Sequence, residues 1–143
     1  AIIQTGQSIE VRNLDPEPHN VRVETFKNLR VNRLLQPNLV QPNQAPLQVG
    51  PFQVAEPAPV PVSCDIQPWM RAYWLVVDHP YAAMTGIDGS LQIKDLPEGE
   101  HEFRVWHERS GYVNRSLKVV VKADTTVDVP TIKVPVKSLL EAK

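Results

Sequence analysis

Two sulfur-containing side chains, Cys64 and Met70, lie at the two ends of one short segment of the chain. A thiolate and a thioether are soft ligands, and together with an imidazole they suit copper. His19 stands at the start of an alternating segment about 45 residues upstream of Cys64. In a Greek-key sandwich, places so far apart in the sequence can be adjacent. His19, Cys64 and Met70 are therefore candidate copper ligands.

Each of these residues also has a purely structural interpretation. Free cysteine is among the most buried residue types, so Cys64 fits an ordinary core thiol. His19 fits a ring that satisfies backbone groups in a turn, and Trp69 and Met70 fit core packing. A nucleophilic role for Cys64 is disfavoured, because the charge of Asp65 beside it would raise the pKa of the thiol. These alternatives remain open at the level of the sequence.

Composition excludes several classes of function. The chain has 143 residues, a formal net charge of −1 and one cysteine. That charge is unlike the basic balance of a nucleic-acid-binding domain. One cysteine allows no internal disulfide and no multi-cysteine zinc site. No apolar run has the length of a membrane-spanning helix. With 14 Pro and 6 Gly, the chain is not expected to be mostly helical.

Alternating apolar residues predict strands in the first half of the chain, over residues 8–13 and 21–26. Residues 37–61 hold seven of the prolines, which argues against a helix or a central strand there. We interpret this stretch as a long surface excursion with short extended pieces at 52–54 and 60–64. A connection of that length usually has a function or packs against something.

The second half predicts further strands. Residues 73–78 form a dense apolar run that fits a buried strand. Asp88-Gly89 favours a tight hairpin turn, with Leu91 and Ile93 alternating after it. Strands are also expected around 103–108, 116–122 and 126–132, and a short helical turn within the tail at 136–143. About eight short strands separated by turns predict an all-β sandwich over residues 1–135 as a single domain.

No enzyme motif stands out. The sequence has no glycine-rich phosphate loop and no Gly-x-Ser-x-Gly nucleophile elbow. No pair of carboxylates occurs in a motif that would place them across a cleft. We therefore do not expect a catalyst.

Three segments resemble a cupredoxin-like domain of the plastocyanin/azurin type. More narrowly, they resemble secreted bacterial proteins that carry a Cys-Asp-Ile/Val-His-Pro-Trp-Met loop. Part of the second half resembles the carboxypeptidase-regulatory or transthyretin-like hairpin of the same proteins. The matching pieces are Asp15-Pro16-Glu17-Pro18-His19-Asn20-Val21, Cys64-Asp65-Ile66-Gln67-Pro68-Trp69-Met70, Asp78-His79-Pro80-Tyr81-Ala82, and Leu96-Pro97-Glu98-Gly99 through Val105-Trp106-His107-Glu108.

The resemblance implies a Greek-key sandwich with a type 1 copper site. His19 would be the first imidazole, Cys64 the thiolate and Met70 the weak axial ligand. The second imidazole should stand at position 67, where this chain has Gln67. A type 1 site needs two imidazoles and a thiolate in its trigonal plane, and an amide is a poorer ligand. His79 and His107 are the remaining candidates for the missing imidazole.

Two functions from different classes follow. The first is an extracytoplasmic binding or assembly module with an altered or lost copper site, and the alternative is a copper-binding electron-transfer protein. The Pro-rich stretch at 37–61 suits contact with a protein partner or a larger assembly, through strand addition at an open sheet edge. A homo-oligomer is a further option. The sequence opens at Ala1 without a basic and apolar leader, which fits a mature secreted or periplasmic chain or an arbitrary boundary.

Overall fold

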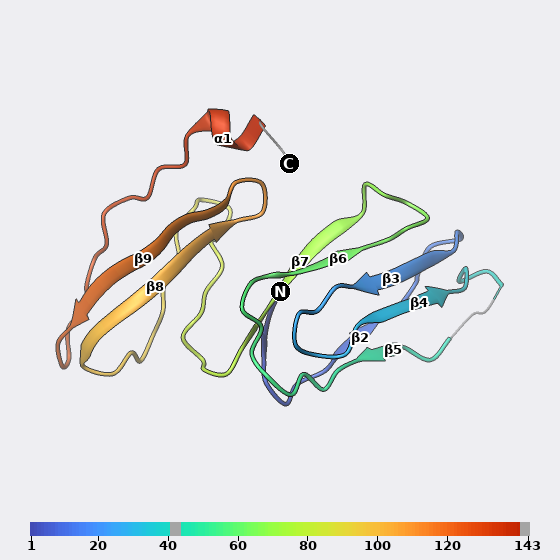
Figure 1. Cartoon of the computed structure of the whole chain (residues 1–143), viewed down its shortest axis with the longest axis horizontal. Coiled ribbons are helices and arrows are strands. Elements are labelled where there is room, and N and C mark those ends of the chain that lie inside the picture. Colours follow the sequence, from blue (N-terminus) through green and yellow to red (C-terminus); the bar gives the residue numbers. More distant parts are fainter. Residues whose placement is uncertain (41–43, 141–143) are drawn as a thin grey trace. The chain divides into compact units, whose positions relative to one another are not determined.

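The computed structural model describes residues 1–40 and 44–140, and strands dominate it (Figure 1). In this part of the chain the elements are β1 (Ile2–Gln4), β2 (Ile9–Val11), β3 (His19–Val23), β4 (Val31–Leu35), β5 (Leu47–Val49), β6 (Val60–Ser63), β7 (Arg71–Val77), β8 (Gly99–His107), β9 (Gly111–Val121) and α1 (Val136–Leu140). The predicted all-β class is confirmed. The Greek-key, cupredoxin-like form of the sandwich stays a prediction.

The chain divides into two compact units, Ala1–Gln92 and Ile93–Lys143. The first unit contains β1 to β7 and the second contains β8, β9 and α1. The prediction of one domain over residues 1–135 is not decided by this division. Among the described residues, no helix has the length and apolar character needed to cross a membrane.

The largest part of the first unit is a five-stranded sheet with the strand order β1-β7-β6-β3-β4. Strand β1 runs parallel to β7, and the other neighbours are antiparallel. Strands β2 and β5 form a separate antiparallel ribbon (Figure 1). The sheet brings β3 beside β6, which are distant in the sequence, and these two strands carry or precede the candidate ligands.

The core lies between the sheet and the ribbon. Alternation along β3 and β7 turns Val23, Trp74 and Val76 inward, as period-2 strands require. Apolar residues of β2 and β5 pack in the same cluster as those of the sheet. The buried members of this core are Ile3, Val21, Val23, Leu35, Val49, Phe52, Val60, Trp74 and Val76.

The interpretation of residues 37–61 as a surface excursion was wrong at a few described positions, whereas the extended piece expected at 60–64 is confirmed by β6. Val49, Phe52 and Glu56 are buried, and β5 lies within the stretch. Its end forms β6, the middle strand of the sheet, although Pro61 lies inside it. Proline is tolerated because the pairing with β3 ends at Val62, and the Pro61 carbonyl still accepts from the Glu24 N–H at 3.1 Å. Residues 41–43 lie outside the described part.

The second unit is built on one long hairpin, β8 with β9. It confirms the strands expected around 103–108 and 116–122, and α1 confirms the short helical turn in the tail. Two other predictions were wrong. The Asp88-Gly89 turn forms, with Gly89 at a φ of 81°, but no strand follows it in the first unit because Leu91 stays exposed and unpaired. Residues 126–132 are extended without strand pairing, and Pro130 interrupts them.

Candidate metal-binding site

The fold brings His19 and Cys64 into direct proximity. His19 opens β3 and Cys64 follows β6, and these antiparallel neighbours pair Arg22 with Ser63. The Nδ1 atom of His19 lies 3.8 Å from the Sγ atom of Cys64. Both residues are buried, with exposed fractions of 7% and 5%. The two residues that the sequence suggested as ligands therefore lie close enough to bind the same metal ion.

Asp15 fixes the orientation of the His19 ring. Its Oδ2 atom lies 2.9 Å from Nε2 of His19, on the side of the ring away from the sulfur. In the neutral tautomer that a bound metal would require, the proton stands on Nε2 and donates to this carboxylate, and the lone pair of Nδ1 faces Cys64. Histidine ligands of metals are commonly held through the second ring nitrogen in this way. The hydrogen bond with Cys64 raises the pKa of His19, burial lowers it, and the hydrogen bond with Asp15 raises it, so the net shift is upward.

The surroundings of Cys64 favour the thiolate, which is the form that binds metals. Burial raises the pKa of the thiol, and hydrogen bonds from the backbone of Asn20, Gln67 and Ile66 and from the His19 ring lower it. The net shift is downward from the ordinary value. The Gln67 backbone N–H donates to Sγ over 3.4 Å, compared with 3.8 Å between Sγ and Nδ1 of His19. The net shift in the pKa of Cys64 is therefore opposite to the rise expected from Asp65, because the hydrogen-bond donors outweigh burial.

A side-chain clamp holds the two candidate ligands together. Asn20, next to His19, donates from Nδ2 to Asp65, next to Cys64, over 2.9 Å, and its Oδ1 accepts from the Asp65 N–H. Asn32 and Arg22 donate to the same carboxylate over 3.2 and 3.3 Å. Burial raises the pKa of Asp65, but these donors lower it further, so the carboxylate stays charged. The clamp fixes the backbone spacing of β3 and the loop that follows β6.

The loop from Cys64 to Met70 is closed by its own backbone. The Cys64 N–H donates to the Met70 carbonyl over 3.2 Å, and the Met70 N–H donates to the Gln67 carbonyl over 2.9 Å. This brings the backbone of both Gln67 and Met70 beside Cys64. Met70 is 42% exposed and Trp69 is 78% exposed. The interpretation of Trp69 as core packing was therefore wrong.

The other predicted imidazoles take part in local contacts. His79 accepts from the Tyr81 N–H over 3.2 Å and stacks on the Tyr81 ring. His107 accepts from the Arg109 N–H over 3.1 Å. Over residues 1–40 and 44–140, no three His, Cys, Asp or Glu side chains form a group that could hold a metal ion. Within the first unit, His79 therefore does not join His19 and Cys64 in a metal-binding group.

The distance between the two donors fits a single bound ion. Metal–imidazole bonds of about 2.0–2.1 Å and metal–thiolate bonds of about 2.3 Å place atoms 3.8 Å apart at an angle of about 120°. That is the angle of a trigonal plane, which type 1 copper sites use. Gln67 stands at the loop position where the resemblance noted in the sequence implies a second imidazole, so a trigonal plane here would lack one strong donor. The residues present therefore fit a copper ion held by one imidazole and one thiolate.

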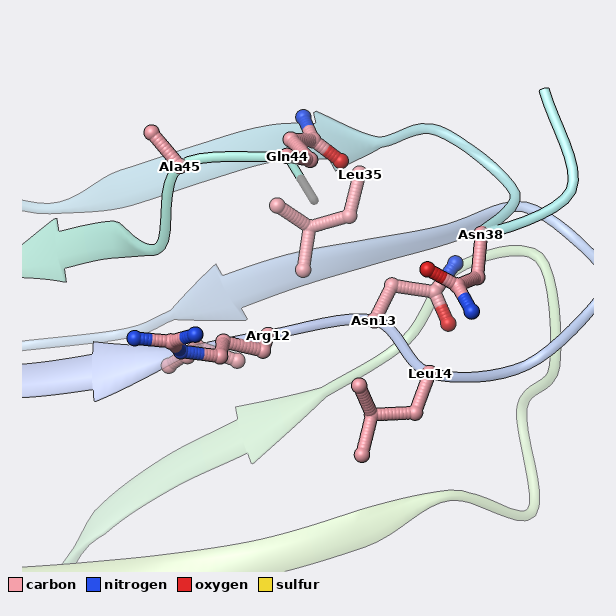
Figure 2. A pocket seen from close by; sticks show the side chains of 8 residues that line it. Arg12, Asn13, Leu14, Leu35, Asn38, Gln44 and Ala45 are labelled. Carbon is pink, nitrogen blue, oxygen red and sulfur yellow. The ribbon is translucent and has the colours of Figure 1, made fainter. Parts of the chain in front are cut away.

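Two surface hollows flank this region. One borders Cys64 and is also lined by Arg22, Asp65, Pro68 and Arg71. Figure 2 shows the other, between the residues that follow β2 and the end of β4. Its Asn13 amide already donates to the carbonyls of Glu17 and Gln36, over 2.8 and 3.0 Å. These hydrogen bonds hold the turn that lines the second hollow and leads to Asp15 and His19.

Comparison with known proteins adds no relative. No family model matches the chain, and no match was found among curated proteins or among solved structures.

Proposed function

We propose that this chain is an extracytoplasmic, cupredoxin-like binding or assembly module whose type 1 copper site is altered at Gln67. His19 and Cys64 keep their role as ligands, and Gln67 replaces the second imidazole. The observation that supports this proposal most directly is the buried contact of His19 Nδ1 with Cys64 Sγ at 3.8 Å. Copper, when bound, would supply a redox-active ion. The chain's own residues orient the two donors and shield them from water.

The same geometry supports binding over catalysis. An aspartate that contacts a histidine, which in turn contacts a cysteine, could act as orienting group, base and nucleophile. A nucleophile must reach a substrate, however, and Cys64 is only 5% exposed although a surface hollow borders it. Residues that bind a metal ion need to be reached only by that small ion and not by a large substrate. The arrangement of Asp15, His19 and Cys64 is therefore better suited to holding an ion.

A copper(II) titration followed by visible spectroscopy tests this proposal. We expect no intense thiolate-to-copper band in the unmodified chain and a blue band in the Gln67→His variant, because the variant restores the trigonal donor set. Adding Cys64→Ser to that variant should abolish the band. Absence of the band in Gln67→His, with its fold intact by circular dichroism, would refute the cupredoxin-like site.

Electron transfer is the second candidate function. The angle of about 120° at a shared ion, worked from the 3.8 Å separation, is the observation that favours it. A blue band in the unmodified chain would make electron transfer the leading function. The assembly role has a separate readout in sedimentation of the purified chain, where a self-associating module shows a concentration-dependent mass.

A further inference from the structure

We propose that the His19–Cys64 site selects copper(I) and does not stably hold copper(II). This inference rests on the proposed function, since it names the ion that the altered site accepts. It would make the chain a carrier of reduced copper, not a centre that cycles between two oxidation states.

The donor set is the first argument. Copper(II) prefers several nitrogen or oxygen donors in a tetragonal arrangement, or two imidazoles with a thiolate in a trigonal plane. In the described part of the chain, His19 and Cys64 are the only strong donors that meet here. Copper(I) is soft, is selected by thiolate and thioether ligands, and accepts low coordination numbers. One imidazole and one thiolate therefore satisfy copper(I) but leave copper(II) short of ligands.

Charge is the second argument. The two donors are 93% and 95% removed from solvent, because their exposed fractions are 7% and 5%. A thiolate with copper(I) forms a neutral unit, whereas a thiolate with copper(II) keeps a positive charge. Burying an uncompensated charge is costly. Asp15 offers only partial compensation, because its side chain is 62% exposed and screened by water.

The loop chemistry is the third argument. Gln67 donates its backbone N–H to Cys64 Sγ at 3.4 Å, which holds this residue at the site. Its amide side chain is a hard oxygen donor, poorly suited to copper(I) and weaker than an imidazole toward copper(II). The thioether of Met70, at the end of the same loop, is a soft donor of the kind that copper(I) accepts. By donor type, the side chains of these two loop residues therefore suit copper(I) better than copper(II).

Paired titrations of the reduced full chain measure this preference. Copper(I) is added without oxygen against a chromogenic copper(I) chelator, and copper(II) is added against glycine. We expect the unmodified chain to retain copper(I) and to lose copper(II) to glycine. Cys64→Ser should weaken copper(I) binding by more than about 100-fold, since loss of a ligand exceeds the 10–100-fold cost of losing a second-shell partner.

Matched variants separate the inference from the proposed function. Gln67→His should gain copper(II) binding by more than about tenfold, whereas Gln48→His, at the exposed position of β5, should gain none at this site. Tight copper(II) binding by the unmodified chain would overturn the inference alone. A blue Gln67→His variant combined with no copper(I) binding by the unmodified chain would also overturn it and leave the proposed function standing. Loss of both would refute the two together.

X-ray absorption at the copper edge keeps the test independent of variants that fail to fold. The unmodified chain loaded with copper(I) should show sulfur and nitrogen neighbours at low coordination number. A shell of nitrogen and oxygen neighbours alone would overturn the inference.

Discussion

Replacing Glu56 by Gln should lower the free energy of unfolding of the first unit by about 2–4 kcal/mol at neutral pH. Glu56 is 7% exposed and caps the turn between β3 and β4. Its Oε2 atom accepts from the Phe26 N–H at 2.9 Å, and its Oε1 atom accepts from the Asn28 N–H at 3.0 Å. The Lys27 N–H lies 3.1 Å from both oxygens, and Asn28 Nδ2 lies 2.7 Å from Oε1. Both oxygens of the carboxylate therefore accept hydrogen bonds.

The magnitude follows from that count. A glutamine offers one oxygen and one NH2 group, so in either orientation its NH2 faces a backbone N–H. At least one charge-assisted hydrogen bond is lost, at about 1.5–3 kcal/mol, and a buried N–H loses its acceptor, at about 1–3 kcal/mol. The two costs overlap, which gives the stated range. The turn follows β3, the strand that carries His19, one of the candidate ligands.

Urea unfolding followed by tryptophan fluorescence measures the effect. The buried Trp74, packed edge-on against Phe52 with ring centroids 6.3 Å apart, reports on this core. Glu17→Gln is the matched control, since the Glu17 side chain is exposed, and it should change stability by less than about 0.5 kcal/mol. An equally small change for Glu56→Gln would refute the reasoning.

The pH dependence gives an independent check. Burial raises the pKa of Glu56, but hydrogen bonds from Asn28, Lys27 and Phe26 lower it further, so the folded-state pKa lies below the ordinary value. The carboxylate's stabilising contribution is therefore fully present above about pH 4.3, the unfolded value, and is lost as the pH falls through the folded pKa. The difference in stability between the unmodified chain and Glu56→Gln should shrink over that window. A difference that stays constant down to low pH would contradict this account.

Three further predictions address the site and the core. Asn20→Ala should lower the free energy of unfolding by about 2–3 kcal/mol in urea titrations, because a buried amide that bonds Asp65 through both ends is lost; a change below about 0.5 kcal/mol would show that the clamp is dispensable. Asp15→Asn should weaken copper(I) affinity about 10–100-fold in chelator competition, and an unchanged affinity would remove Asp15 from the site. Val60→Ala, at a position with 0% exposure, should cost about 2–3 kcal/mol in thermal or urea unfolding, against less than about 0.5 kcal/mol for exposed Val120→Ala; equal costs would place Val60 outside the core.

Part of the site could be predicted because its residues carry their own chemical signal. A cysteine and a methionine at the ends of a loop, with an upstream histidine, suggest soft-metal chemistry from their types alone. The residues that form hydrogen bonds with these candidate ligands were harder to recognise from the sequence. Asp15 precedes His19 by four residues, and Asn20 and Asp65 each adjoin a candidate ligand, so all three were visible as neighbours. Their hydrogen bonds depend on the approach of β3 and the loop after β6, which no local pattern encodes.

The fold shows a similar division. Alternation in residues 8–13 and 21–26 and the dense run at 73–78 predicted β2, β3 and β7, because period 2 with one buried face is local information. Strands β1 and β4 were missed because their residues do not alternate between apolar and polar, and β5 was missed because the prolines around it argued against a strand. Residues 126–132 had the pattern of a strand but no partner to pair with.

The sequence by itself determined the all-β class, the turn chemistry at Asp88-Gly89 and the identity of the candidate donors. These depend on side-chain type and on spacing within a few residues. Tertiary structure alone decided that Pro61 lies in a middle strand and that Phe52 belongs to the core. It also decided that His19 and Cys64 stand 3.8 Å apart, with N–H donors turned toward the sulfur. The physical reason is that strand order and burial arise from pairing between distant segments, and the pKa of a thiol depends on which groups that pairing places around it.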